Sequence, residues 1–227
     1  MLKLVLASLL AFPIVAADHI DVKYASKDVV LTADPSSKFW KGSVPVLATK
    51  SNLGVDLPSN RTEIRVRWTK TNLYVLMSCP YEELYLLPNP NAIQETNKLW
   101  EHDVAEIFLG ADFKNIHQYR EYQVSPQGEW VDLDIDTKKS RPEGGWKWDS
   151  KMVVKARIDA KSKTWYAEFK IPLESVTSEP IQPGTLLRGN FYRFQGPPPD
   201  RKMVAWLPTG RISNHTPEAF GTLKLVQ

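Results

Sequence analysis

The chain has 227 residues, a length that suits one domain of sandwich or barrel type. Its 29 basic and 26 acidic residues give a formal net charge of +3 without any basic block to follow a row of phosphates, which argues against binding to nucleic acid or a membrane surface. Eight Trp, eight Tyr and 17 Pro favour strands and loops over helices, and a single cysteine excludes an internal disulfide, so stability must come from a buried core.

The N-terminus has the pattern of a secretory signal. Met1-Leu2-Lys3 is short and positively charged, an apolar run continues to Val15, and small residues follow it. The alternative is an N-terminal membrane anchor, but the apolar run is short for a spanning helix and contains a proline. We therefore predict a signal peptide over residues 1–17 and one domain over residues 18–227, which is secreted or periplasmic after cleavage.

The first expected elements are strands. Residues 28–32 and 44–49 are short apolar stretches separated by a Pro/Ser loop. Residues 61–69 then alternate between apolar and charged side chains, the period of a half-buried strand. The polar residues 70–72 predict a turn into residues 73–78, which gives an antiparallel hairpin with one face in the core.

Residues 80–99 contain three prolines and many polar side chains, which predicts a long loop. Long loops in compact domains tend to carry function. This loop leads directly to Trp100, so a functional site is expected where it ends.

Glu106 lies in the middle of an apolar strand that begins at Val104. The alternation of this strand places Glu106 on the same face as Val104 and Phe108. A buried carboxylate without a partner is costly, so Glu106 must meet a cation, hydrogen-bond donors or a ligand. The indole of Trp100 offers a flat apolar surface nearby, and an aromatic ring beside a carboxylate suits a sugar.

Both residues also have structural interpretations. Trp100 can be an ordinary core residue, and Glu106 can form an internal ion pair with Arg120 or Arg193. The sequence does not decide between these interpretations and a binding site.

A second hairpin is expected after the central strand. Residues 118–125 and 129–136 form its strands, and Ser125-Pro126-Gln127-Gly128 suits a type I turn. In the returning strand the carboxylates of Asp132, Asp134 and Asp136 share one face. They could chelate calcium, or they could form a solvated face of the sheet.

The loop over residues 141–149 carries Trp146 and Trp148, which either contact a ligand or pack over the open end of the sheet. The remaining strands are expected at residues 152–158, 164–171, 186–195, 203–207 and 220–226, with one helical turn within residues 172–178. About ten short strands without alternating helices predict an all-β, antiparallel β-sandwich or flattened barrel.

Six segments also carry a resemblance to a known family. They are Thr71-Asn72-Leu73-Tyr74-Val75, residues 99–109, residues 122–128, residues 165–172, Gly189-Asn190-Phe191-Tyr192-Arg193 and residues 217–223. In this order the segments resemble the family-9 carbohydrate-binding modules and their relatives in the DOMON-like group. The resemblance implies an immunoglobulin-like or DOMON-like β-sandwich of about ten strands that binds sugars.

The resemblance further implies a sugar held between two tryptophans. The first falls on Trp100 and the key carboxylate falls on Glu106. An arginine of some members falls near Gln123, and a glutamine falls near Tyr192. The place of the second tryptophan holds Asn214-His215-Thr216 instead. Trp206, Trp146 and Trp148 are the available substitutes, and the structural calcium of many members has no assignable ligands here.

The function expected from these observations is non-catalytic carbohydrate binding that supports polysaccharide breakdown, with no cofactor required. The candidate sugar-binding residues are Trp100, Glu106, Gln123, Asn190, Tyr192 and His215. A glycoside hydrolase is the expected partner, and the protein is alternatively an accessory to such an enzyme.

Two other classes of function are considered. A hydrolase would need a pair of acids from Glu101, Asp103 and Glu106, but residues 101 and 103 share one face of a strand and 106 takes the other. A haem or redox protein would need axial ligands such as Met77, His102 or Met203, and no haem attachment motif is present.

Overall fold

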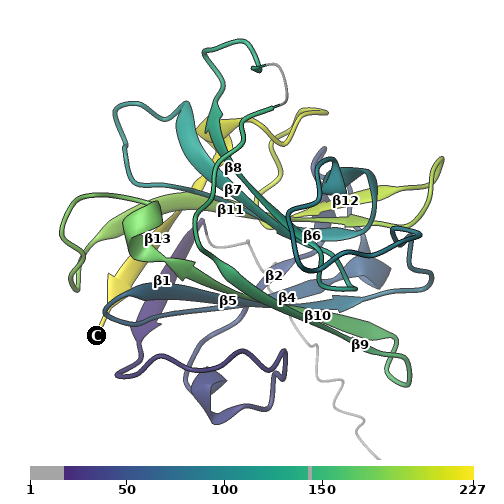
Figure 1. Ribbon diagram of the computed structural model, residues 1–227, viewed down its shortest axis with the longest axis horizontal. Helices are drawn as coiled ribbons and strands as arrows, with labels where there is room; N and C mark the ends of the chain where they lie inside the picture. The colour runs from purple at the N-terminus through teal and green to yellow at the C-terminus, as the bar shows by residue number, and fades with distance from the viewer. Residues whose placement is uncertain (1–17, 143–144) are drawn as a thin grey trace, which may run out of the picture.

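The computed structural model describes residues 18–142 and 145–227 (Figure 1). Within these residues every regular element is a β-strand or a short 3-10 helix, so the prediction of an all-β fold is confirmed. The predicted signal peptide over residues 1–17 lies outside the described residues. Across the described part of the chain, we find no helix with the length and apolar character needed to span a bilayer.

The elements follow in chain order. The strands are β1 (His19–Tyr24), β2 (Val46–Ala48), β3 (Lys50–Ser51), β4 (Thr62–Trp68), β5 (Asn72–Pro80), β6 (Val104–Gly110), β7 (Gln118–Val124), β8 (Trp130–Asp136), β9 (Val153–Asp159), β10 (Thr164–Pro172), β11 (Leu186–Gln195), β12 (Lys202–Ala205) and β13 (Gly221–Val226). The 3-10 helices are η1 (Lys38–Trp40), η2 (Pro58–Asn60), η3 (Leu99–Glu101), η4 (Leu173–Ser175) and η5 (Pro217–Ala219).

All 13 strands belong to one continuous sheet in the order β8-β7-β6-β11-β13-β1-β4-β5-β10-β9. β12 pairs with β11 and β3, and β2 pairs with β4. The sheet curls over so that the half with β6, β7, β8 and β11 lies above the half with β4, β5, β9 and β10 (Figure 1). The strand number exceeds the predicted ten, and β1 runs parallel to both β13 and β4, so the sheet is not purely antiparallel.

The main core fills the space between the two halves. In β4 the buried residues are Ile64, Val66 and Trp68, and they alternate with half-buried charged residues as predicted. β6 contributes Ala105, Ile107 and Leu109 from the opposite half. The other face of β6 is buried as well, against a smaller apolar cluster outside the main core. This second cluster is the face on which Glu106 lies.

The two predicted hairpins are confirmed. β4 pairs with β5 and β7 with β8, both antiparallel, and β9 pairs with β10 in the same way. The β7–β8 turn closes through a hydrogen bond of 3.1 Å from the amide of Gly128 to the carbonyl of Ser125. Gly128 has a φ of +97°, a backbone conformation that side chains disfavour, which explains the glycine at the last turn position.

The strand predicted over residues 28–32 is wrong, and the first strand is β1 instead. The reason is that side chains provide the partners of this segment. The Asp28 carboxylate accepts hydrogen bonds from Thr69 and Asn72, and the amide of Val29 donates to the Tyr74 hydroxyl at 3.1 Å. The segment is therefore extended but does not join the sheet.

The helical turn expected within residues 172–178 is present as η4, a single 3-10 turn. Cys79 is buried in the main core and is free, as the single cysteine required.

Candidate functional site

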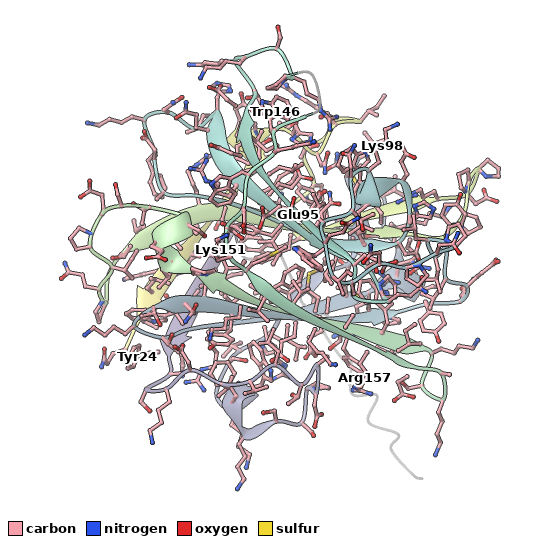
Figure 2. The ribbon with its side chains drawn as sticks, viewed as in Figure 1. Tyr24, Glu95, Lys98, Trp146, Lys151 and Arg157 are labelled. Carbon is pink, nitrogen blue, oxygen red and sulfur yellow. The ribbon has the colours of Figure 1, made fainter. Side chains whose placement is uncertain are left out.

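A pocket of about 310 Å³ opens on the face of the sheet that points away from the main core. Its walls are apolar and include Trp100 and Trp146. Its floor is polar and includes Glu106 and Glu121. Its lining consists of Trp100, Glu106, Glu121, Leu133, Ile135, Arg141, Trp146, Phe194, Met203, Asn214 and His215. Trp146 belongs to the loop that follows β8 and is labelled near the top of Figure 2, above β7 and β8.

The strand register determines what lies beside Glu106. On β7 its direct neighbour is Gln123, and on β11 its direct neighbour is Tyr192. Since residues directly opposite on paired strands share a face, these three side chains form a row across the sheet. The middle residue of this row, Glu106, lines the pocket.

Glu106 is buried, and two side-chain amide groups donate hydrogen bonds to its carboxylate oxygens. Gln123 Nε2 donates to Glu106 Oε1 at 2.7 Å, and the side-chain amide of Asn214 donates to Glu106 Oε2. Gln123 Nε2 also donates to Oε1 of Glu121 at 2.6 Å, so two buried carboxyl groups share one donor. Among the described residues no Lys or Arg side chain lies within 4.0 Å of either carboxylate.

The ion pair considered for Glu106 does not form. The guanidinium of Arg120 pairs with Asp134 on β8. Arg193 is fully buried, and its guanidinium donates to Thr62, to the carbonyl of Pro80 and to Gln195. Both arginines therefore serve other carboxylates or carbonyls, and Glu106 faces the pocket without a cation.

Burial shifts the proton affinities of the floor. It raises the pKa of Glu106 well above the ordinary value, and the charge of Glu121 adds to this effect. It also raises the pKa of Glu121 to about 7. The pKa of His215 falls to about 4 because burial disfavours the charged imidazolium and because Arg141 repels it. Near neutral pH the imidazole is uncharged and the carboxyl pair retains a proton.

Two tryptophans from separate segments form walls of the pocket. Trp100 belongs to η3, whose backbone carbonyls accept hydrogen bonds from Arg201, including one of 2.6 Å to Trp100 O. Trp146 is held by its carbonyl, which accepts a hydrogen bond of 3.2 Å from the amide of Asp134. The guanidinium of Arg141 lies 5.0 Å from the ring centre of Trp100 and 5.7 Å from that of Trp146.

His215 lines the pocket and is held by contacts on both sides of its ring. Its Nδ1 lies 2.7 Å from the hydroxyl of Tyr119, and its ring stacks on Phe108 with centroids 5.0 Å apart. Nε2 lies 3.9 Å from the carboxylate of Glu121. The imidazole therefore forms a positioned polar edge rather than a mobile surface group.

The model of the family described as carbohydrate family 9 binding domain-like matches residues 35–227. The chain belongs to this family. No curated protein matches this family 9 domain significantly.

Solved structures agree on the fold of the family 9 domain. A family 9 carbohydrate-binding module from Caldicellulosiruptor kristjanssonii in complex with cellotriose has a TM-score of 0.63 at 16% identity, with 92% of this chain and 93% of that chain covered. The module from the same organism in complex with glucose has a TM-score of 0.64 at 16% identity, covering 91% and 95%. A crystal structure of a protein from Bacteroides uniformis reaches 0.73 at 15% identity, covering 91% and 98%.

The family 9 domain brings together some of the sequence-predicted site residues. Trp100, Glu106 and His215 line the pocket. Gln123, Asn190 and Tyr192 do not line it, since all three are fully buried behind its floor.

The buried residues hold the floor in place. Asn190 Nδ2 donates to the Tyr192 hydroxyl at 2.7 Å, and this hydroxyl donates to the backbone carbonyl of Asn214 at 3.2 Å. The carbonyl of Leu207 accepts a second bond of 2.8 Å from Asn190. These contacts position the Asn214 amide, which in turn holds Glu106.

Of the three tryptophans considered as a second wall, Trp146 lines the pocket and the others do not. Trp206 is buried in the main core, with its ring centre 5.6 Å from that of Phe191. Trp148 packs against the main core, and the guanidinium of Arg120 lies 4.6 Å from its ring centre.

Sequence reasoning missed Glu121, Arg141 and Asn214 as lining residues of the family 9 domain. A signal for Glu121 was available, because the alternation of β7 places it on the same face as Gln123, which pairs with Glu106. For Asn214 the strand pattern gives no signal, but the resemblance does, because Asn214-His215-Thr216 takes the place of the second tryptophan and only His215 of this segment was named as a candidate. Arg141 has neither signal, because its position depends on the path of the loop after β8.

The proposed calcium face of β8 does not form. Asp134 pairs with Arg120, and Asp136 pairs with Lys139 at 3.0 Å. Asp132 instead meets Glu95 and Asp149, and one oxygen of each carboxylate lies within 4.8 Å of the others. Glu95 lies near the centre of the molecule in the view of Figure 2.

The oxygens of Asp132 test whether this cluster suits a hard cation. Oδ2 accepts a hydrogen bond of 3.1 Å from the amide of Ser150, but Oδ1 is buried and has no partner. An unsatisfied buried carboxylate oxygen beside two further carboxylates matches the oxygen ligands that calcium prefers. The residues therefore fit a calcium ion.

The acids considered for catalysis do not converge in the family 9 domain. Glu101 is exposed beside Lys98 at 3.6 Å, and Asp103 is buried, accepting a hydrogen bond of 2.6 Å from the amide of Gly196. The haem ligands do not share a cavity either. Met77 is in the main core, His102 stacks on Tyr85, and Met203 lines the pocket.

Proposed function

We propose that the chain is an exported, non-catalytic carbohydrate-binding protein that holds one sugar ring in the pocket between Trp100 and Trp146. The observation that carries this proposal is that two indoles face one guanidinium above a floor with two buried carboxyl groups. The sandwich, DOMON-like arrangement implied by the resemblance is part of the proposal, supported by the curled sheet.

Each group has a role in this mechanism. The C–H faces of the sugar stack on the two indoles, and the ring hydroxyls donate to Glu106 and Glu121. The Asn214 amide and the His215 imidazole complete the polar contacts at the floor. Stacking contributes about 0.5–1.5 kcal/mol beyond buried area and a charged hydrogen bond about 1.5–3 kcal/mol, so we expect a micromolar to millimolar dissociation constant.

Arg141 occupies the space between the indoles in the free protein. A sugar ring that stacks on both tryptophans must displace this guanidinium. Because the side chain is exposed, its cation–π contacts oppose binding by only about 0.5–1 kcal/mol.

The biological setting is also a proposal. The modules from Caldicellulosiruptor kristjanssonii are complexes with cellotriose and glucose, so we propose glucose-containing oligosaccharides as ligands of this chain. Secretion or export to the periplasm would place the protein beside extracellular polysaccharides. There it would support their breakdown in partnership with a glycoside hydrolase.

Calorimetry and tryptophan fluorescence test the proposal, using residues 18–227 with glucose and cellotriose. Both Trp100→Ala and Trp146→Ala should weaken binding at least about tenfold, because each removes one stacking surface. Trp148→Ala is the matched control, since this indole comes from the same loop but lies outside the pocket. Retained affinity in both pocket variants, with folded circular dichroism, would refute the proposed site.

We also propose that Glu95, Asp132 and Asp149 hold a structural calcium ion. The ion would join the loop before η3, strand β8 and the loop that carries Trp146, so it would stabilise one wall of the pocket. It makes no direct contribution to sugar contact in this proposal. Its measurable consequence is a melting temperature that rises with calcium concentration.

A further inference from the structure

Within residues 18–142 and 145–227, no Lys or Arg side chain pairs with the carboxylates at the floor of the pocket. Glu106 and Glu121 are 1% and 2% exposed, and they share Gln123 Nε2 as a donor. In the part of the chain that the structure describes, the nearest basic group in an ion-pair contact with either is His215, at 3.9 Å from Glu121. Burial keeps that imidazole uncharged near neutral pH.

The walls of the pocket already accept a cation. The guanidinium of Arg141 lies over Trp100 and Trp146, and aromatic faces attract positive charge. Arg141 comes from an exposed loop, whereas Lys side chains are not among the pocket residues. A ligand that displaces Arg141 therefore removes the only Lys or Arg side chain among the described residues of the lining.

We propose that the pocket prefers sugars that carry a primary ammonium group, namely hexosamine units, over neutral hexoses. This inference rests on the proposed function, because it names the class of sugar that the same pocket binds. An ammonium group brings a positive charge and three donors to two carboxylates. A neutral hexose brings donors only, so the pair must retain a proton, and an N-acetylated amine loses the charge.

Binding of an ammonium sugar is coupled to the release of one proton. When an ammonium group enters, the proton held by the Glu106–Glu121 pair leaves for the buffer, and both carboxylates are then ionised beside the cation. The other titratable or charged groups that interact with the pair are Tyr119 on β7, Tyr192 on β11, Arg201 before β12, His215 before β13 and Arg141 after β8. A neutral hexose requires no such release.

Calorimetry at pH 7 in two buffers of different ionisation enthalpy tests the inference with glucosamine, glucose and N-acetylglucosamine. Glucosamine should bind at least about tenfold more tightly than the other two, with net proton release that glucose lacks. In Glu121→Gln the ratio of glucosamine to glucose affinity should collapse towards one. The matched control Glu179→Gln, an exposed acid outside the pocket, should keep the wild-type ratio.

A second variant keeps the test decisive if Glu121→Gln does not fold. Arg141→Ala removes the competing cation from an exposed loop and should strengthen glucosamine binding more than glucose binding. Glucose binding without a preference for glucosamine would overturn this inference alone. Binding of no sugar at all would overturn the inference together with the proposed function.

Discussion

Glu106 and Glu121 are two buried carboxyl groups that share a single amide donor. Every residue of β6 is buried, so an acid at its centre requires partners, and it finds two amides. Neither amide carries a charge that would stabilise a second carboxylate. The folded protein consequently favours a protonated form of the pair.

This pair makes the free protein less stable as the pH rises. The pKa of Glu121 is about 7 in the folded state against an ordinary value of 4.5, so its protonated form stabilises the fold fully below about pH 4.5. That stability is lost as the pH rises through about 7, a change on the order of 1–3 kcal/mol. We expect the melting temperature, followed by circular dichroism, to fall between about pH 6.5 and pH 8. At lower pH His215 opposes this trend, because burial lowers its pKa to about 4 and the uncharged imidazole loses stability as the pH falls.

Substitutions test whether the Glu106–Glu121 pair causes this dependence of the melting temperature on pH. Glu121→Gln should flatten this fall in melting temperature, whereas Glu179→Gln should leave it unchanged. Burial also raises the pKa of Asp103 to about 6 and that of Glu95 to about 7, so both residues contribute to the same trend. A pH profile of Glu121→Gln as steep as that of the wild type would contradict the assignment.

At the scale of elements, three segments that are distant in sequence converge at Asp132. Glu95 precedes η3, Asp132 lies on β8, and Asp149 lies in the same loop as Trp146. Three carboxylates within 4.8 Å repel one another in the absence of a cation. The ammonium group of Lys151 pairs with Asp149 and offsets part of this repulsion, and a bound cation would offset the rest.

Calcium should reverse the effect of one substitution. Without calcium, Asp132→Asn should raise the melting temperature, because it removes a buried and partly unsatisfied charge. With calcium at 100 times its dissociation constant, the wild type should gain about 2.7 kcal/mol and the variant should gain nothing. Asp136→Asn, which changes an acid paired with Lys139, is the control and should respond like the wild type. A wild type whose melting temperature ignores calcium would contradict the proposed site.

At the scale of the whole molecule, β1 connects the two halves of the sheet. It lies between β13 and β4 and runs parallel to both. Val22 on this strand is fully buried in the main core, while its neighbour Lys23 is exposed. The contact between the ends of the chain therefore contributes to the stability of the entire fold.

Val22→Ala should lower the free energy of unfolding by about 2 kcal/mol, because it removes two buried methyl groups and leaves a cavity. Lys23→Ala is the matched control on the same strand and should change it by less than about 0.5 kcal/mol. Urea unfolding followed by tryptophan fluorescence measures both. Equal effects of the two substitutions would mean that β1 does not pack as described.

The hairpins were predictable because each is local. Alternating side chains and a turn with a suitable glycine specify β7–β8 within 19 residues, from Gln118 to Asp136. The first strand was missed although Ile20, Val22 and Tyr24 alternate, because the pattern is short and directly follows the predicted signal peptide. The segment at residues 28–32 was misassigned because its partners are side chains from β5, β10 and the β4–β5 turn.

The sequence by itself determined that the chain is all-β, that Glu106 lies on the same face as Phe108, and that its carboxylate needs partners. These follow from strand periodicity and from the cost of burying a charge. Only the tertiary structure decided which groups meet it. The register of β7 against β6 brings Glu121 into the pocket. The paths of two loops bring Asn214 and Arg141 there. Trp146 and Trp100 line the same pocket although they are distant in sequence, a placement that long-range packing and not local pattern controls.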